Sequence, residues 1–394
     1  MKKVTIIALV VAVTAVFAVS AMAAEWNLYG SARMETFWKS TDLTNDNVFG
    51  DSTVNDLTWT FQNNSRVGAT VKAEHISGRF EYGARPAVRD NGAVTNFANV
   101  RRLFGVWHFT EGWGLKVGKD YTPITFFLSG QVVDADAGLL FVGNAYGGRK
   151  GLVEIDGKLG PGTLKFAAID PGSAGIATIP TFLGDIDVAT DTETNVPKFE
   201  VSYEFGLSDA MSFHAFGGYQ YKKQQIAATG TTPAGTPFVF NFDDNINSWM
   251  VGAGADMNFG PMFVKPQVSY YQNGAAAGWL GSRTPGGDSA LPVINNNGQI
   301  ADVSSLMAML ALGFSPTEAM TLEGGIGYLY TDVDDGYENS AYDAYIQLVW
   351  SLASGVYLVP EVGYRDYGDF EPAIGQSVDL GSQFYAGAKW QIDF

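Results

Sequence analysis

The last fifteen residues, Leu380–Phe394, alternate between two kinds of side chain. Every second residue is apolar or small, ending with Trp390 and Ile392, whereas most of the residues between them are polar, such as Lys389 and Gln391. A period of two is typical of a β-strand. The run is longer than an ordinary strand of roughly five or six residues, and it suits a tilted strand that crosses a hydrocarbon layer, which takes about 9 to 11 residues.

The same alternation recurs along the chain, for example over residues 66–74, 198–205 and 343–351. Within each run the charged residues fall almost entirely on one face. Alternation alone does not reveal which face is wet, because a soluble sheet also has one polar and one apolar face. The number of strands and the lengths of their connections separate the two cases.

Sixteen candidate strands can be counted, and their connections alternate in length. The strands begin near residues 26, 57, 79, 99, 115, 151, 163, 196, 211, 246, 262, 302, 320, 341, 356 and 380. Seven tight turns rich in turn-forming residues are expected at 77–78, 111–113, 160–162, 207–210, 259–261, 315–319 and 352–355. Eight longer connections lie between them, at 41–56, 87–98, 121–148, 171–195, 223–245, 273–301, 333–340 and 368–378. Such a pattern predicts an all-β fold, a transmembrane antiparallel up-and-down β-barrel of 16 strands, in which closure removes the unpaired edges that lipid does not tolerate.

The first 23 residues predict a secretory signal peptide. Lys2 and Lys3 precede an apolar stretch over residues 4–19, and Ala21 and Ala23 form the small-residue end that the peptidase requires. The alternative, an uncleaved membrane anchor, is disfavoured by the short apolar stretch. Residues 24–394 are then the mature barrel, in which no run of about 20 apolar residues offers a spanning helix.

Composition narrows the chemistry that the chain can perform. It contains no cysteine and three histidines, which excludes a thiol nucleophile and a metal site built from His and Cys. The net charge of −17 argues against nucleic acid as a partner, and in a wet pore it favours cations.

Two short patterns could carry other chemistry. Ser212 and His214 share a strand face, as in an outer-membrane hydrolase, but such neighbours lie about 7 Å apart, too far for a direct hydrogen bond, so lumen-lining polar residues are the favoured interpretation. Residues 332–336 begin like a calcium loop, but Asp343 stands where such a loop has Glu. Recruitment of divalent ions by this loop stays open as an alternative. We expect no enzyme, and hence no catalytic residue, no cofactor and no built metal site.

Three local marks accompany the strand plan. The mature chain opens with Ala24–Gly30, AEWNLYG, and residues 114–123, GLKVGKDYTP, look like a fifth strand that runs into a long third loop. The chain ends in Phe394, with Trp390 and Phe384 on the same face. With these marks the whole mature chain resembles the sixteen-stranded homotrimeric general porins of Gram-negative outer membranes, and the last three residues resemble the signal that the barrel assembly machinery reads.

The resemblance implies that the third loop, residues 121–148, folds into the lumen and narrows it. It implies an acidic side of the constriction, for which Asp134 and Asp136 are the candidates, the alternative being ordinary solvated loop acids. It also implies a basic cluster on the early strands, for which the lumen-facing candidates are Arg33, Arg66, Lys72, Arg79, Arg85 and Arg102, with Arg101 uncertain by one residue of register. Some of these could instead pair with Glu35, Glu74 or Glu81. The family's Pro-Glu-Phe-Gly-Gly segment is absent, and residues 128–138 stand in its place.

Opposite charges across a water-filled neck would create a transverse field that orients dipolar solutes. The expected function is therefore passive diffusion of small hydrophilic solutes and ions across the outer membrane. Two alternatives stay open: a solute-specific channel, and a structural or adhesive barrel with a plugged pore. The resemblance further implies export through the periplasm, a homotrimer, and outer-membrane lipid and lipopolysaccharide as surroundings.

Overall fold

The computed structural model describes residues 24–43, 52–84, 99–140, 142–171, 186–231, 237–280, 293–294, 300–334, 338–373 and 376–394. The predicted signal peptide, residues 1–23, and Arg85 lie outside these ranges. No helix in the described ranges is long and apolar enough to cross a membrane.

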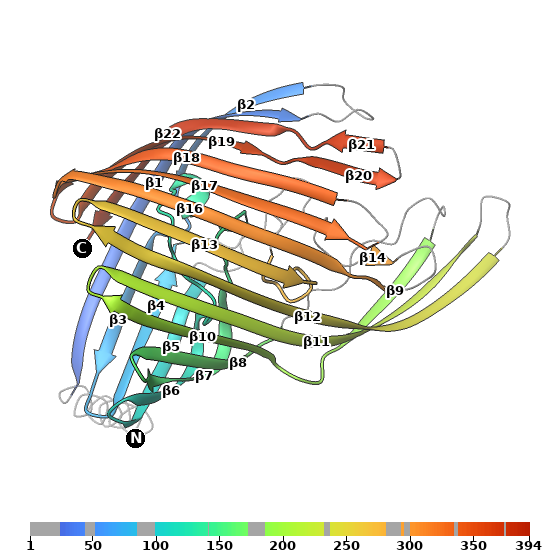
Figure 1. Cartoon of the computed structure of the whole chain (residues 1–394), viewed down its shortest axis with the longest axis horizontal. Helices are drawn as coiled ribbons and strands as arrows, with labels where there is room; N and C mark the ends of the chain where they lie inside the picture. The colour runs from blue at the N-terminus through green and yellow to red at the C-terminus, as the bar shows by residue number, and fades with distance from the viewer. Residues whose placement is uncertain are drawn as a thin grey trace, which may run out of the picture.

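Within the described ranges, eighteen strands form a single antiparallel sheet that closes on itself (Figure 1). In chain order they are β1 (Glu25–Leu43), β2 (Ser52–Phe61), β3 (Arg66–Lys72), β4 (Ile76–Gly83), β5 (Asn99–Thr110), β6 (Trp113–Tyr121), β7 (Arg149–Leu159), β8 (Gly162–Ile169), β9 (Ile186–Glu193), β10 (Lys198–Ser208), β11 (Met211–Thr231), β12 (Pro237–Phe259), β13 (Met262–Gln272), β16 (Val303–Thr317), β17 (Met320–Val333), β18 (Glu338–Ala353), β19 (Val356–Asp366) and β22 (Ser382–Asp393). Two short hairpins lie outside the sheet, β14 (Val293–Ile294) with β15 (Ile300–Ala301), and β20 (Asp369–Ala373) with β21 (Gln376–Asp379).

The eighteen strands occupy sixteen positions around the barrel. β2 and β3 pair with successive parts of β1, so together they fill one position. β9 and β10 pair in the same way with β11 and fill another. The first and last strands pair from Ser31–Asp393 to Asp42–Ser382, and this pairing closes the barrel. The predicted fold class and the predicted number of sixteen strands are thus confirmed.

Several predicted connections differ from the structure: β2 begins at Ser52, inside the connection expected at 41–56, and β9 lies inside the connection expected at 171–195. The turn expected at 77–78 is wrong, because the chain reverses at Ala73, whose N–H donates to the Ile76 carbonyl at 2.7 Å, and Ser77 and Gly78 already belong to β4. Gly78 marks a close approach instead of a turn, since a Cβ there would lie 2.9 Å from the Phe104 carbonyl oxygen.

The connection expected at 223–245 is largely strand. β11 and β12 continue to pair as far as Thr231 and Pro237, and Figure 1 shows this hairpin extending past the neighbouring strands. The four successive residues Lys222–Gln225 are all polar, so the apolar alternation that marks a spanning strand is interrupted there although the pairing continues.

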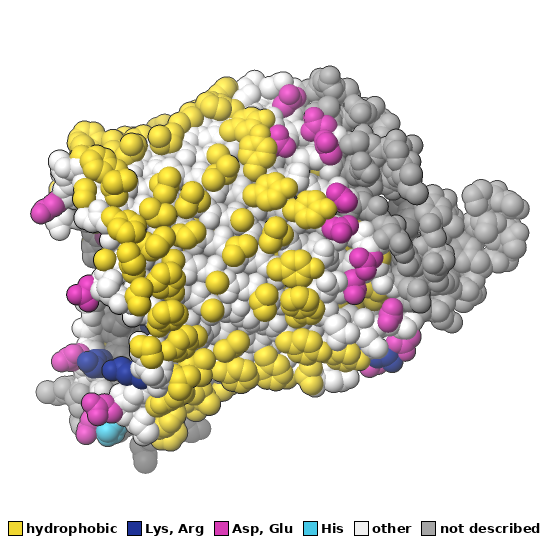
Figure 2. Space-filling view, viewed as in Figure 1, with side chains coloured by type: hydrophobic (Ala, Val, Ile, Leu, Met, Phe, Trp, Pro, Cys, Tyr) yellow, Lys and Arg dark blue, Asp and Glu magenta, His cyan; other side chains and the backbone are white. Residues whose placement is uncertain are grey.

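The outer wall of the barrel is apolar and its interior is polar. Figure 2 shows apolar side chains spread over the wall, and the acidic side chains visible on this face gather at its two ends. Leu28 is 77% exposed and Trp59 is 71% exposed, whereas Glu81 and Glu200, which face inward, are each 1% exposed. Leaving a large apolar side chain in water forgoes about 1.5–3 kcal/mol, so a surface of this kind requires lipid. The face assignment on which the sequence argument depended is therefore correct.

Candidate pore constriction

The segment between β6 and β7, residues 122–148, makes its contacts with inward-facing side chains of the barrel. Its backbone N–H groups donate to carboxylates on three different strands. Val132 and Val133 donate to Glu361 of β19, at 2.7 and 3.1 Å. Gly130 donates to Glu323 of β17 at 2.6 Å, and Ala135 donates to Glu35 of β1 at 2.9 Å. Because these carboxylates project into the barrel, they hold the segment inside it.

An apolar cluster reinforces these hydrogen bonds. It joins loop residues to inward-facing side chains of β1, β16, β18, β19 and β22, and its members are Phe37, Leu128, Val132, Val133, Ala137, Leu139, Met309, Ala311, Tyr345, Val359 and Tyr385. Apolar residues such as Met309 break the rule that inward positions of a membrane barrel are polar. They do so where the segment covers them, so this part of the lumen is a packed interior and not a water-filled space.

The tip of the segment has an unusual backbone. α2 (Val133–Asp136) contains left-handed residues, and φ is 53° at Asp134, 61° at Ala135 and 66° at Asp136. Left-handed backbone costs roughly 1–2 kcal/mol for each residue that carries a Cβ. Side-chain contacts at the same residues offset that cost.

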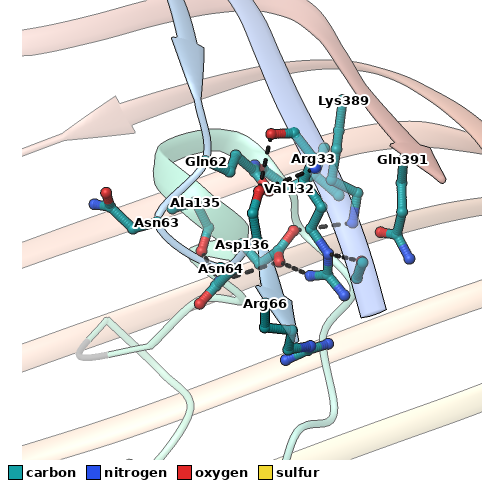
Figure 3. Close-up of polar contacts among 12 residues, drawn as sticks. Arg33, Gln62, Asn63, Asn64, Arg66, Val132, Ala135, Asp136, Lys389 and Gln391 are labelled. Atoms are coloured by element: carbon teal, nitrogen blue, oxygen red, sulfur yellow. Dashed lines mark hydrogen bonds and ion pairs between the residues drawn. The ribbon is translucent and has the colours of Figure 1, made fainter. Parts of the chain in front are cut away.

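Both aspartates of the tip lie in ion pairs with the barrel wall. Arg33 Nη1 and Lys389 Nζ lie 2.5 and 2.9 Å from the two carboxylate oxygens of Asp136, and Asn64 donates to the same carboxylate at 3.1 Å (Figure 3). Lys39 Nζ lies 2.5 Å from Asp134, whose second oxygen pairs with Arg365. The alternative that these are ordinary solvated loop acids is therefore wrong.

The pairing also determines how these two carboxyl groups titrate. Burial by itself raises the pKa of Asp134, but Arg365 and Lys39 outweigh it and hold that pKa far below its ordinary value. Burial likewise raises the pKa of Asp136, and Lys389 and Arg33 bring it below the ordinary value. Both groups therefore stay ionised at neutral and mildly acidic pH.

The predicted basic residues separate into different places. Arg33 contacts the loop acid directly instead of facing it across a gap. Arg66 and Arg79 form ion pairs with Glu81, at 3.9 and 3.0 Å. The alternative that some of these basic residues pair with a glutamate of the wall therefore applies at Glu81. Lys72 stands apart and exposed near the turns, where with Arg79 it lines a cavity of about 860 Å³.

A β-bulge resolves the uncertain register at Arg101. Glu81 pairs with Arg102 and Tyr82 pairs with Val100, so Arg101 is an extra residue in β5. Both arginines then project inward, since Arg101 Nε donates to Glu81 at 2.7 Å and Arg102 Nε donates to Asp120 of β6 at 2.6 Å. A bulge of this kind places two successive side chains on one side of a strand.

Three basic residues that hold the loop acids were missed by the sequence argument: Lys39, Arg365 and Lys389. Their strand parity marks them as lumen-facing, and Lys389 lies on the polar face of the last strand. Their role depends on barrel closure, which brings β19 and β22 beside β1, and alternation within one strand carries no information about that neighbourhood.

A second segment that was expected in an outer loop also enters the lumen. Residues 273–280 pack against Ile124 of the first segment in a cluster that buries Trp279 completely. The Trp279 indole N–H donates to Glu200 at 2.9 Å. Lys222 and Lys198 donate to the carbonyls of residues 276 and 277, at 2.8 and 3.1 Å. Both segments therefore narrow the lumen from the same part of the wall, the arc of strands from β10 to β22.

The remaining candidates lie as follows. The His214 ring stacks on Phe126 of the loop with centroids 3.9 Å apart, and its Nε2 lies 3.4 Å from Gln267 Nε2. At the chain end, Phe394 and Gly30 exchange backbone hydrogen bonds of 2.6 and 3.1 Å, and the Phe394 ring lies over the glycine. Phe384 and Trp390 face outward, 41% and 49% exposed. The role of these three aromatic residues in assembly stays a prediction.

Neither a family model nor a curated protein matches this chain. Solved structures do. The outer membrane channel DcaP of Acinetobacter baumannii has a TM-score of 0.66 and 18% identity, covering 95% of this chain and 98% of that one. The trimer form of OmpT from Vibrio cholerae has a TM-score of 0.57 and 15% identity, covering 94% and 99%. The anion-selective porin from Comamonas acidovorans has a TM-score of 0.54 and 13% identity, covering 94% and 100%. The chain therefore has the fold of the sixteen-stranded outer-membrane porins.

Proposed function

We propose that this chain forms a channel in the outer membrane of a Gram-negative bacterium, through which small hydrophilic solutes and ions diffuse passively. One observation carries the proposal: the barrel is closed, with apolar side chains outside and charged side chains inside. The likeness to outer-membrane channels and porins over nearly the whole chain supports it. The proposal includes no chemical step, and it assigns no catalytic role to Ser212 or His214.

Planar-bilayer recording of the purified protein tests this function. A general diffusion channel gives ohmic conductance steps at every insertion. Conductance that a particular solute blocks identifies a solute-specific channel. Silence from folded protein identifies a structural or adhesive barrel and contradicts the proposal.

The solute-specific channel is the second candidate, and the two inward segments favour it. Residues 122–148 and 273–280 fill the arc from β10 to β22 with side chains and backbone, so the passage that remains runs along the opposite wall. Swelling of protein-loaded liposomes in sugars of increasing size measures the passage. A sharp cutoff at small solutes supports a selective channel, and gradual decline supports a general one.

We further propose that the barrels assemble as a homotrimer surrounded by outer-membrane lipid and lipopolysaccharide. A solved neighbour described as a trimer form supports the oligomeric state. Unboiled protein should migrate in detergent gels at three times the mass of the boiled protein. Migration as a single barrel before boiling would contradict the trimer without affecting the channel.

A further inference from the structure

The wall that the two inward segments leave open is formed by strands β3 to β7, and it is rich in cations. The contacts of residues 122–145 run mainly to β1, β10, β11, β13, β17 to β19 and β22. Arg66, Arg79, Arg102 and Lys116 project from the open wall into the lumen. We call these four side chains the cationic arc.

Each member of the cationic arc is paired with a carboxylate that lies deeper in the wall. The side chains of Arg66 and Arg79 are 25% and 28% exposed, whereas that of their partner Glu81 is 1% exposed. The Arg102 side chain is 18% exposed and that of its partner Asp120 is 4% exposed, and the Lys116 side chain is 14% exposed and that of its partner Glu154 is 1% exposed. In every pair the cation is the partner that meets the water of the lumen.

The carboxylates are also outnumbered. With the buried Arg101, which donates to Glu81 at 2.7 Å, five cations share the three carboxylates of Glu81, Asp120 and Glu154. Glu81 holds the arginines in place, and Tyr29 supports it by donating to the same carboxylate at 2.9 Å and accepting from Arg79 Nε at 2.6 Å. The arc is therefore preorganised, with guanidinium groups held toward solvent.

The opposite arc has the reverse arrangement where its ion pairs meet water. In the pair of Lys265 with Asp256 at 3.0 Å, the acid is the more exposed partner, at 33% against 22%. Most other acids of this arc, such as Glu323 and Glu361, are covered by the loop and accept its N–H groups. The loop-tip acids are also partly exposed, Asp134 at 32% and Asp136 at 23%, but each of them is paired with two cations. The net exposed charge along the open passage is thus set by the cationic arc.

We infer that the cationic arc makes this channel prefer anions that carry carboxylate or phosphate groups, which guanidinium groups bind with two parallel hydrogen bonds. The inference rests on the proposed channel function and names its substrate class. It opposes the expectation of cation preference from the net charge of −17, because screening limits a charge to a range of about 8–10 Å in salt solution. Many of the acids gather at the two ends of the wall (Figure 2), whereas the arc lines the passage itself and acts at closer range.

The reversal potential of the channel in a potassium chloride gradient tests the inference. The unmodified protein should pass chloride more readily than potassium. Replacement of Arg66, Arg79 and Arg102 by Gln should lower the ratio of chloride to potassium permeability by roughly twofold or more, since the local potential that concentrates anions is removed. Inorganic phosphate added to the bath should reduce chloride current in the unmodified channel more than in this triple variant.

Two variants serve as controls. Lys223→Gln removes one positive charge from the outer face of β11, where Lys223 pairs with Asp243 at 2.7 Å, and it should leave the ratio unchanged, whereas the single variant Arg79→Gln should lower it. Arg79→Lys keeps the charge and should retain most of the anion preference that Arg79→Gln loses. A conducting channel that prefers potassium, or a conducting triple variant with the unmodified ratio, overturns the inference and leaves the channel function standing. Silence from the folded, unmodified protein overturns both.

Discussion

At the scale of single residues, Glu361 shows how a membrane barrel secures a segment in its lumen. Its two carboxylate oxygens accept consecutive backbone N–H groups of the loop, at 2.7 and 3.1 Å, and its side chain is buried. A buried hydrogen bond contributes roughly 0.5–1.5 kcal/mol, and a buried N–H group left without a partner costs about 1–3 kcal/mol. One side chain therefore fixes the position of the loop tip relative to β19.

Replacement of Glu361 by Ala should free this part of the loop and raise single-channel conductance. The matched control is Glu318→Ala, which removes an exposed glutamate from the tight turn between β16 and β17 and should leave conductance unchanged. The Glu361→Ala and unmodified proteins should both resist detergent before boiling, which shows that they are folded. If their conductances are then equal, other contacts hold the loop in place.

The loop acids Asp134 and Asp136 should make the constriction insensitive to mild acid. Their folded-state pKa values lie below the ordinary value of about 3.9, so their ion pairs stabilise the loop at any pH above that value and are lost only as pH falls further. We therefore expect that titration of these two acids causes no change in conductance between about pH 8 and pH 5 at constant salt. The double variant Asp134→Asn with Asp136→Asn should show the same pH dependence of conductance in this interval. A step in that interval, present in the unmodified channel and absent from the variant, would contradict this assignment.

At the scale of elements, residues 273–280 act as a second inward segment that depends on Trp279. This indole is fully buried among loop and wall residues and donates to Glu200 at 2.9 Å. Truncation of a buried Trp costs about 3–5 kcal/mol, which is enough to release a short segment.

The Trp279→Ala channel should consequently conduct more current than the unmodified channel. Trp59→Ala provides the matched control, because Trp59 faces outward from β2 and is 71% exposed. If both variants retain the original conductance, residues 273–280 do not limit the passage.

At the scale of the whole molecule, the barrel is turned inside out relative to a soluble protein. Most of its ion pairs are inside, and exposed apolar side chains such as Leu28 and Trp59 are outside, so the hydrocarbon layer stabilises the outer wall while water and the inward segments fill the lumen. Closure between β1 and β22 leaves no edge of the sheet unpaired in lipid.

This arrangement predicts opposite tolerances for the two faces of one barrel. Leu103→Arg places a charge on the lipid face in the middle of β5, where Leu103 is 52% exposed, and should reduce stability by about 2–4 kcal/mol if it lies near the midplane. Thr163→Arg, on the lumen face of β8 opposite Glu204, should be nearly neutral. Unfolding by urea in lipid vesicles measures both, and an equal loss for the two variants would contradict the assignment of faces.

Much of the architecture was predictable because it depends on local patterns. Alternation along each strand assigned Arg66, Arg79 and Lys389 to the lumen, and the spacing of turns led to sixteen strand positions. The turn predicted at Gly78 was wrong, because the sequence alone does not distinguish a glycine that permits close approach of two strands from a glycine that permits a chain reversal. The bulge at Arg101 was equally hidden, because an extra residue in one strand is defined only against its partner.

The chain's two-residue period decides which way each side chain points, because successive side chains of a strand leave opposite faces whatever the strand pairs with. That period carries no information about which strands become neighbours across the closing seam or which loop enters the lumen. Only the closed barrel brings Lys389 of the last strand and Arg33 of the first to one aspartate of a loop more than a hundred residues from either. The direction of the charges is thus a local property of the sequence, whereas their partners, and with them the path that solutes take, follow from three-dimensional packing.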